Sequence, residues 1–244
     1  MAGAGTIVSC GWRRGLLALA LLLPAMARAA EPVAAPPAIP DAELAARLDF
    51  LERRLDAARP ASLAWQWGWT GFYSASLAAN AGYAAVADDH DDRVRAIVDA
   101  VKSGVAMVQT LRLTRDPLPG NLGAEPMRAT PGEDRAARLQ RLAVGERQLL
   151  ASAERAETRY DLRRHLLVVG GNLLGGAVIL AFGSARDAIT STAIGTAIGE
   201  AQIWSQPWRA TDDLRDYRSA FPDASGTGWE LRPRGPGVEL VLRF

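Results

Sequence analysis

Residues 166–185 read LLVVGGNLLGGAVILAFGSA, a run of 20 residues without a charge. Glycines at positions 170, 171, 175 and 176 interrupt this run. Ser184-Ala185-Arg186-Asp187 closes it and matches a capping box for a new helix. We therefore predict a buried helix, a short polar turn, and a second helix from about residue 188 to 204 that ends near Pro207.

A second stretch has the same arrangement. Residues 60–87 are 28 residues without a charge, rich in tryptophan and tyrosine, and Asp88-Asp89-His90-Asp91-Asp92 follows them. Acidic residues suit the N-terminus of the next helix, so this cluster is interpreted as a capped turn in preference to a cation site. Asn80 precedes Gly104 by 24 residues and Asn172 precedes Gly195 by 23, which indicates a duplicated helical hairpin.

Amphipathic segments flank the two predicted hairpins. Leu44, Leu48, Leu51 and Leu55 share one face of a helix that Asp41 is expected to cap and that Pro60 is expected to end or interrupt. Residues 114–132 are rich in proline and glycine and are interpreted as a loop, either a linker or a lid. Thr130-Pro131-Gly132-Glu133 is a capping-box pair that predicts the start of the following helix.

The C-terminal segment changes its period from helix to strand. Residues 229–231 and 238–244 flank a turn rich in proline and glycine, and apolar side chains alternate from Val238 to Phe244. This pattern predicts a small β-hairpin packed on the helices. A terminal aromatic residue on an alternating strand also resembles the closing strand of an outer-membrane barrel, but the helical pattern upstream argues against a barrel.

The N-terminal segment has the features of a secretory signal. Arg13 and Arg14 precede a short apolar stretch at residues 15–23, and Ala27-Arg28-Ala29 supplies a small-x-small cleavage site. Cleavage would leave 25 basic and 27 acidic residues, a net charge of −2, and would remove Cys10, the only cysteine. We therefore expect a periplasmic or envelope-associated protein of a bacterium, without a disulfide or a thiolate metal ligand.

The predicted organisation is a signal peptide at residues 1–29, a tether rich in proline and alanine at 30–40, a helical bundle at 41–220 with a loop at 114–132, and a β-hairpin at 221–244. The fold class is all-α, a bundle of two antiparallel helical hairpins with flanking amphipathic helices and a small C-terminal β-hairpin. The near-neutral charge excludes a nucleic-acid binder that works by bulk electrostatic attraction.

Membrane insertion is weighed as the alternative to a soluble or peripheral bundle. The charge-free runs are long enough to span a bilayer, and two G-x-x-x-G patterns would allow close helix packing. Against this, the helix after residue 90 carries Arg95, Asp99 and Lys102, and each charge costs about 2.5–3.5 kcal/mol at mid-bilayer. A soluble bundle is therefore the first interpretation, and an integral membrane protein is the second.

Glu200 is the strongest candidate for a functional residue. It shares an apolar helical face with Ala193, Ala197 and Trp204, and a buried acid must be paired, hydrogen-bonded or protonated. Its expected partners in the bundle interior are Asn80, Asn172, Gln66 and Gln202. His165 is interpreted as part of a polar helix start. We predict no metal ligands and no cofactor.

Three functions follow from these features. The first is a non-enzymatic envelope protein that binds a protein partner or an apolar ligand such as a lipid. The second is a small integral membrane protein whose glycine-rich helices assemble in the bilayer. The third is a hydrolase-like enzyme that uses Glu200, although Gly-x-Ser-x-Gly, His-Glu-x-x-His and phosphate-loop patterns are absent from the sequence.

Overall fold

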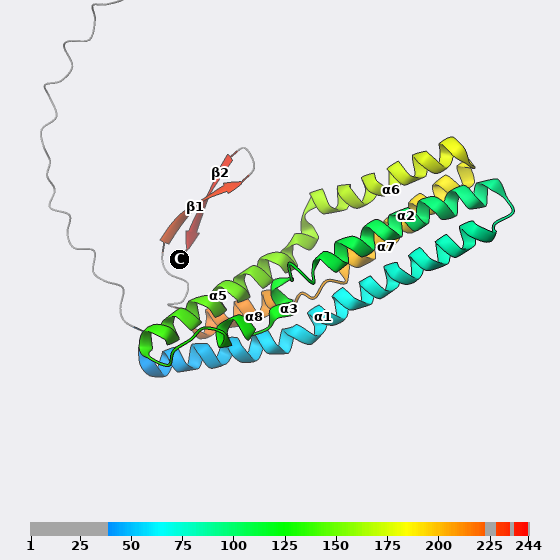
Figure 1. Cartoon of the computed structure of the whole chain (residues 1–244). Helices are drawn as coiled ribbons and strands as arrows, with labels where there is room; N and C mark the ends of the chain where they lie inside the picture. The colour runs from blue at the N-terminus through cyan, green and yellow to red at the C-terminus, as the bar shows by residue number, and fades with distance from the viewer. Residues whose placement is uncertain (1–38, 223–227, 235–236, 244) are drawn as a thin grey trace, which may run out of the picture. The chain divides into compact units, whose positions relative to one another are not determined.

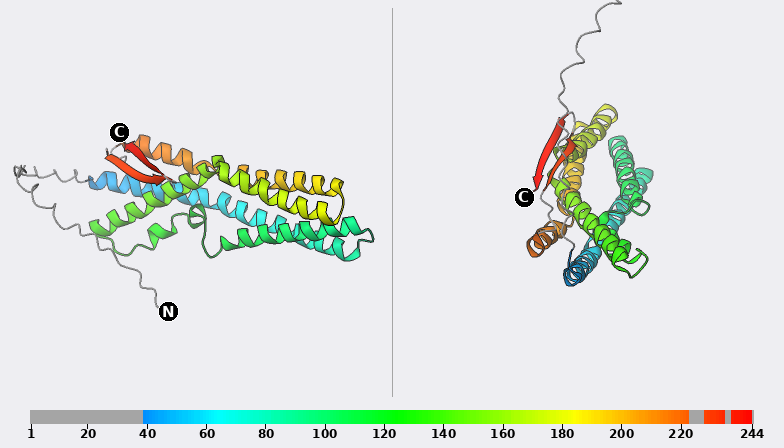
Figure 2. Two further views of the ribbon diagram at one scale, coloured as in Figure 1. Left: turned by 90° about the horizontal axis from the view of Figure 1, so that it is seen from above. Right: turned by 90° about the vertical axis from the view of Figure 1, so that its left-hand side faces the viewer.

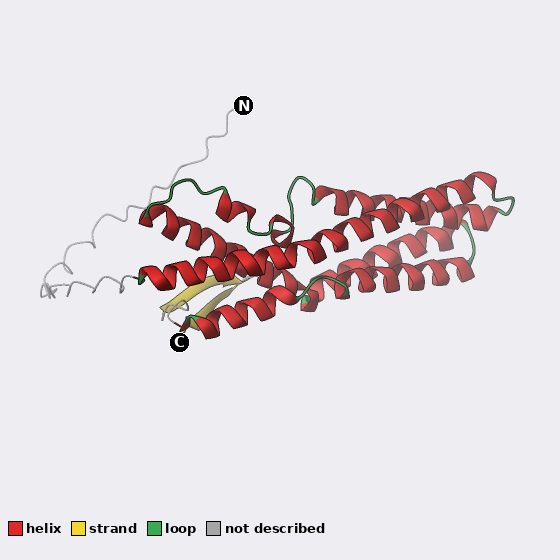
Figure 3. Ribbon diagram, turned by 90° about the horizontal axis from the view of Figure 1, so that it is seen from below, coloured by secondary structure: helices red, strands yellow, loops and turns green. Residues whose placement is uncertain are grey.

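The computed structural model describes residues 39–222, 228–234 and 237–243, with side chains for the first of these ranges. The signal peptide at residues 1–29 and most of the tether at 30–40 lie outside the described residues. The elements are α1 (Asp41–Val86), α2 (His90–Arg112), α3 (Pro119–Leu122), α4 (Glu125–Arg128), α5 (Arg135–Glu157), a 3₁₀ turn η1 (Thr158–Tyr160), α6 (Leu162–Phe182), α7 (Ala185–Trp204), α8 (Arg209–Ala220), β1 (Gly228–Arg234) and β2 (Gly237–Arg243). Helix makes up nearly all of the described chain (Figure 3), so the all-α bundle is confirmed.

Helix α1 is much longer than the sequence predicted. It continues through Pro60 and unites the amphipathic segment and the charge-free run in one helix of 46 residues. The prediction that Pro60 ends or interrupts the helix is therefore wrong. Proline removes one backbone hydrogen bond, and here the helix packs on α5 and α8 before Pro60 and on α2 after it, which compensates for that loss. Asp41 does not cap the helix either, because Pro40 occupies that position.

Two predicted helix starts are confirmed by their capping bonds. The Asp89 carboxylate accepts hydrogen bonds from the backbone N–H groups of Asp91 and Asp92 at the start of α2. The Ser184 hydroxyl accepts from the N–H of Asp187 at 3.1 Å at the start of α7. The predicted hairpins, α1 with α2 and α6 with α7, therefore turn where the sequence placed the caps (Figure 1).

The connection between α2 and α5 differs from the prediction. It contains the short helices α3 and α4, and Asn121, Ala124 and Met127 are buried in it, so it packs as part of the bundle rather than as a linker or lid. The predicted helix start at residues 130–133 is also wrong. Helix α5 begins at Arg135 because the Asp134 carboxylate accepts a hydrogen bond from the N–H of Ala137.

The apolar core occupies one part of the bundle, which we call the leucine-core half (residues 41–63, 113–161 and 205–222). There α1 packs against α3, α5 and α8, and α5 packs against α8. Three of the four predicted leucines, Leu44, Leu51 and Leu55, are buried, and Leu48 is partly buried against them. The other core members come from α5, α8 and the connecting segment, namely Ala124, Met127, Leu142, Leu149 and Tyr217.

The remaining helices form the four-helix half, which consists of residues 64–112 and 162–204. It contains the second half of α1 together with α2, α6 and α7, and the two hairpins lie side by side (Figure 2). We call the end with the turns at residues 87–89 and 183–184 the tip, and the end that joins the leucine-core half the base. Strands β1 and β2 pair antiparallel, with Trp229 opposite Leu242. The packing of a hairpin on the bundle stays a prediction.

Glycines hold α6 and α7 at short range. A Cβ atom added at Gly199 would overlap the Cγ1 atom of Val168, whereas one added at Gly171 would meet nothing within 4 Å. Valine is stiff about χ1, so Val168 cannot easily move aside. The G-x-x-x-G pattern at residues 195–199 therefore contributes to the contact between α6 and α7 through Gly199.

Substitution at these two glycines tests the contact. We expect Gly199→Ala to lower the free energy of unfolding by roughly 1–3 kcal/mol through overpacking. Gly171→Ala is the matched control, and we expect it to leave stability unchanged or to raise it by up to about 1 kcal/mol, because alanine favours helix. Thermal unfolding followed by circular dichroism measures both, and equal effects would contradict the packing described.

Asp56 fastens the connecting segment to α1. Its carboxylate accepts from both Nη atoms of Arg128, at 2.7 and 3.1 Å, and from the N–H of Ala124 at 3.0 Å. The Arg128 hydrogen bonds, with help from the Ala124 N–H, hold the pKa of Asp56 below its usual value. A carboxyl group with a lowered pKa stabilises the fold above its unfolded pKa of about 4, and this contribution is lost as the pH falls through the folded value.

Asp56→Asn therefore has a pH-dependent effect. We expect it to lower stability at pH 7 by roughly 0.5–1 kcal/mol, since the pair is partly exposed, and to change it much less near pH 3. Asp49→Asn, in the exposed ion pair with Arg53, is the control. Thermal unfolding at the two pH values measures the difference, and a loss of the same size at both would show that the ionised carboxylate is not the stabilising group.

Candidate functional site

The four-helix half has an apolar outer surface. In residues 64–86, 94–108, 166–182 and 187–204, every exposed residue is glycine, apolar or aromatic except Thr190. Near the middle of the helices the exposed side chains are Phe72, Val101, Leu173, Leu174 and Ile194. This is the reverse of the leucine-core half, where leucines lie inside and most charged side chains lie outside.

Several polar side chains of the four-helix half lie between its helices and bind each other. At the middle level Lys102 Nζ lies 3.0 Å from Asp99 Oδ1 and donates to the Ser191 hydroxyl at 3.0 Å and to the Ser191 carbonyl at 3.3 Å. The Ser191 hydroxyl donates to Asp99 Oδ1 at 2.5 Å. We call these three residues the lysine triad. It joins α2 to α7 and leaves one positive and one negative charge in contact.

Small residues make room for the lysine triad. A Cβ atom at Gly175 would lie 3.0 Å from Lys102 Cδ, and one at Gly195 would lie 2.8 Å from Lys102 Nζ. Asn172 lies against the same glycine, and its side-chain amide donates to the Val168 carbonyl of its own helix. Glycines from both G-x-x-x-G patterns therefore accommodate polar side chains, in addition to bringing helix backbones together.

A second charged pair lies at the tip. Arg95 Nη1 donates to Asp187 Oδ1 at 2.9 Å, which links α2 to α7, and Arg95 also pairs with Asp92 at 3.0 Å. The Tyr83 hydroxyl donates to Asp92 Oδ2 at 2.9 Å and links α1 to α2. All three charged residues of α2 that argued against a membrane thus have partners within the bundle.

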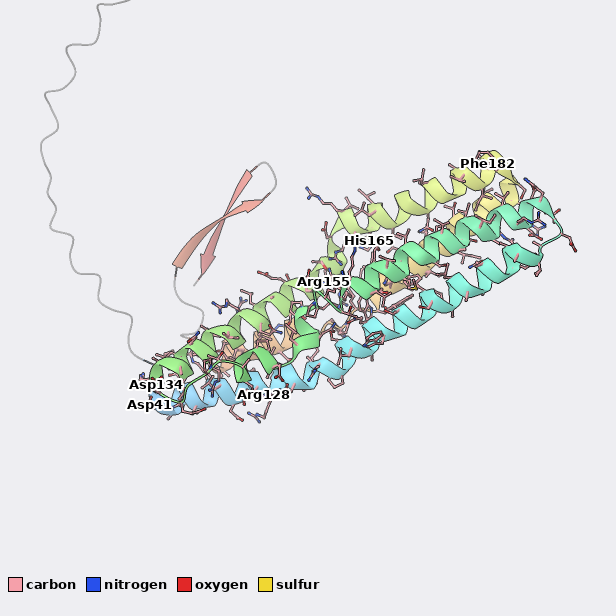
Figure 4. All side chains as sticks on the ribbon, in the orientation of Figure 1. Asp41, Arg128, Asp134, Arg155, His165 and Phe182 are labelled. Atoms are coloured by element: carbon pink, nitrogen blue, oxygen red, sulfur yellow. The ribbon has the colours of Figure 1, made fainter. Side chains whose placement is uncertain are left out.

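The base of the four-helix half holds the only other charged pair between its described helices. His165, labelled in Figure 4, makes two short contacts. Its Nδ1 atom lies 2.7 Å from Glu200 Oε2, and its Nε2 atom lies 2.7 Å from the Arg159 carbonyl oxygen. A carbonyl oxygen can only accept a hydrogen bond, so His165 Nε2 carries a hydrogen. The contact between His165 Nδ1 and the Glu200 carboxylate needs one further proton, which these two groups share. The Trp204 ring packs on His165, with 5.7 Å between ring centroids.

The structure brings few of the predicted site residues together. Glu200 and Trp204 meet at His165, whereas Gln202 accepts from the Tyr73 hydroxyl at 3.0 Å. Gln66 lies outside this group and accepts from the Asn121 side-chain amide. Asn80 donates to the Ser76 carbonyl of its own helix. None of the four expected amide partners is bonded to Glu200 in the described residues, so the predicted network is wrong in its membership.

Sequence reasoning missed Lys102, Asp99 and His165. Lys102 is the only lysine in the chain and stands three residues after Asp99, within one helical turn of it, which was the available signal. His165 was interpreted as part of a polar helix start, because nothing in the sequence brings residue 165 near residue 200.

The geometry at Glu200 does not resemble a hydrolytic centre. Both ring nitrogens of His165 have partners, and neither partner is a hydroxyl group that the histidine could activate. The described residues contain no group of three or more His, Cys, Asp or Glu side chains arranged to hold a metal ion. The arrangement can hold charge in a shielded interior, and it shows no assembled nucleophile and base.

Comparisons with protein-family models, with curated proteins and with solved structures found no match for this chain. By length and composition, one helix among the described residues, Leu162–Phe182, is long and apolar enough to cross a membrane.

The lysine triad can be tested by removing its charges singly and together. We expect Lys102→Met to lower stability by roughly 1–3 kcal/mol, because Asp99 is left without its cation in a partly buried position. The double variant Lys102→Met with Asp99→Leu should recover much of that loss. A double-mutant cycle on thermal unfolding measures the coupling, and the exposed pair Arg53 and Asp49 provides the control. Additive effects at Lys102 and Asp99 would contradict an interior charge pair.

Proposed function

We propose that the protein is a helical membrane protein of the bacterial envelope, whose four-helix half lies in a lipid bilayer while its leucine-core half lies in water. One observation carries the proposal: along residues 64–86, 94–108, 166–182 and 187–204 of its four helices, every exposed residue is glycine, apolar or aromatic except Thr190. Soluble monomers seldom expose more than a few hundred Å² of contiguous apolar surface, so a surface of this extent needs a covering.

Helix length supports the proposal. The 21 residues of α6 extend about 32 Å at 1.5 Å per residue, close to the hydrocarbon thickness of about 30 Å. Helices α2 and α7 have 23 and 20 residues, and residues 64–86 of α1 match them. All four segments therefore fit one bilayer thickness.

The inward charges remove the main objection to insertion. Arg95, Asp99 and Lys102 would each cost about 2.5–3.5 kcal/mol if they faced lipid at mid-bilayer. Each instead pairs with a residue of the bundle, and polar residues of membrane proteins face the bundle interior in this way. Composition alone selects only α6 because the other three helices contain more polar residues, and a composition test does not register which of these face inward.

Aromatic residues at the base support the same placement. Tryptophan and tyrosine concentrate where the hydrocarbon of a bilayer meets water. The base carries such side chains from α1, η1 and the end of α7, namely Trp65, Trp67, Trp69, Tyr160, Trp204 and Trp208. The tip ends in Asp88, Asp89, His90, Asp91 and Asp92, which lie beyond the apolar surface.

Within this proposal the protein binds rather than catalyses. Lipid and other membrane helices are the partners of its outer surface, and the leucine-core half is available to an envelope protein. The C-terminal strands are proposed to form a small accessory hairpin on the bundle. A soluble bundle whose apolar surface is covered by a protein partner is the alternative, and the experiment below separates the two. The hydrolase-like function is disfavoured by the saturated bonding of His165.

Alkaline carbonate extraction with two matched leucine substitutions tests membrane insertion. We expect the full-length wild type, expressed in bacteria, to remain in the membrane pellet. Leu174→Arg places a charge on the outer surface at the middle of α6, at a cost of about 2.5–3.5 kcal/mol, and we expect it to shift protein to the supernatant or to degradation. Leu139→Arg, at an exposed leucine of α5 in the leucine-core half, is the control and should behave like the wild type.

Two results would overturn the proposal. Wild-type protein that is released by carbonate is bound peripherally or through a partner. Equal behaviour of Leu174→Arg and Leu139→Arg would show that lipid does not contact the outer surface of α6.

A further inference from the structure

The base of the four-helix half contains an open hollow between α1, η1 and the segment that follows α7. Its volume is about 1020 Å³. Its lining combines small residues of α1, including Ala61, Ala64 and Gly68, with aromatic side chains and with polar residues that include Arg159 and Arg209. The aromatic members are Trp65, Trp69, Phe72, Tyr160, Trp204 and Trp208.

The aromatic walls are held in place by hydrogen bonds. The Trp69 indole N–H donates to the Ser205 hydroxyl at 3.0 Å, and the Trp65 indole N–H donates to the same oxygen at 3.2 Å. Tyr160 and Trp204 pack edge to face, with 5.8 Å between ring centroids. Hydrogen bonds between α1 and the C-terminal end of α7 therefore hold Trp65 and Trp69 in place in the hollow.

Two arginines give the hollow a positive charge. Arg159 is only 8% exposed and donates to the carbonyl oxygens of Ala156 and Gln206. Among the described residues no carboxylate lies within 4 Å of its guanidinium, which stacks over the Trp208 ring at 5.9 Å. A buried cation without a carboxylate partner favours an anion nearby.

Arg209 and the start of α8 add to this charge. Arg209 Nε donates to Asp213 Oδ2 at 3.2 Å, and this carboxylate, which also pairs with Arg54, offsets part of the Arg209 charge. Helix α8 has 12 residues and no side-chain cap, and Trp208 and Arg209 at its N-terminus line the hollow. Uncapped helix N–H groups attract anions such as phosphate.

From this arrangement, and resting on the proposed function, we propose that the hollow binds the headgroup of an anionic phospholipid. The phosphate would lie between Arg159, Arg209 and the N-terminus of α8, and the acyl chains would run along the exposed apolar surface of α1 and α7. A binding site for an anionic phospholipid needs aromatic side chains at the membrane–water boundary and basic side chains near the phosphate, and the hollow has both. A free phosphate would use the basic groups but not the apolar surface.

Quenching of tryptophan fluorescence by brominated lipids tests this proposal on the full chain. The protein is placed in phosphatidylcholine vesicles with a minor fraction of phosphatidylglycerol, and bromine is carried either by that phosphatidylglycerol or by an equal fraction of phosphatidylcholine. We expect phosphatidylglycerol to be preferred on the order of fivefold for each arginine that it engages. Arg209→Gln should reduce the preference, and Arg215→Gln, at an exposed arginine of the same helix, should not.

Each outcome has a distinct meaning. Arg159→Gln provides a second variant, and circular dichroism shows whether either variant is folded, while the comparison of the two wild-type vesicle types needs no variant. Equal quenching by the two brominated lipids would overturn the lipid site and leave membrane insertion intact. Quenching by neither lipid would overturn both proposals. A preference that inorganic phosphate removes would assign the basic groups to free phosphate and overturn the lipid headgroup.

Discussion

The contact of Lys102 with Asp99 and Ser191 is the constraint on which the four-helix half depends. It turns the charged face of α2 toward α7, and the opposite face of α2 is then the apolar one that is exposed. A lysine and an aspartate of one helix could not both face lipid, so this pair decides which side of the bundle is inside. The Arg95–Asp187 pair likewise turns charged side chains of α2 and α7 toward each other at the tip, and the His165–Glu200 pair does the same for α6 and α7 at the base.

The two halves of the bundle follow opposite rules of burial although α1 passes through both. Before Pro60 the helix buries leucines against α5 and α8, and after it the helix buries Gln66, Thr70 and Tyr73 and exposes Trp67 and Phe72. A single helix can do this because each part meets different neighbours. Burial of apolar surface stabilises the leucine-core half. Under the proposed insertion, polar contacts and close packing at glycines would stabilise the four-helix half inside a bilayer.

Local patterns predicted much of this fold. The leucine stripe at residues 44–55, the caps at Asp89 and Ser184 and the two helical hairpins are short-range features, and the structure confirms them. The prediction at Pro60 was wrong because contacts distant in sequence override a local breaking signal, and the predicted start of α5 was wrong because another local cap, further along the chain, replaces Thr130. For example, packing on both sides keeps α1 continuous, and Asp134 provides a better cap than Thr130.

The candidate site was less accessible to sequence reasoning. Glu200 was singled out as an acid on an apolar face that needs a partner, and the structure pairs it with His165, which lies 35 residues away in the sequence. Lys102 was visible as the single lysine, yet its meaning depends on Ser191, which comes from the other hairpin. A count of charged residues treats each one as exposed to the surroundings of the helix. In this structure the direction in which a charged side chain points matters more than the number of charges.

Collision of a nitroxide spin label with oxygen and with a water-soluble nickel complex tests the central claim most directly. In a Cys10→Ser background, single cysteines replace Leu174, Val101 and, as the control in the leucine-core half, Leu139. The account predicts that labels at 174 and 101 in reconstituted vesicles meet oxygen far more often than nickel, while the label at 139 meets nickel freely. Equal access of the nickel complex to all three positions would contradict it.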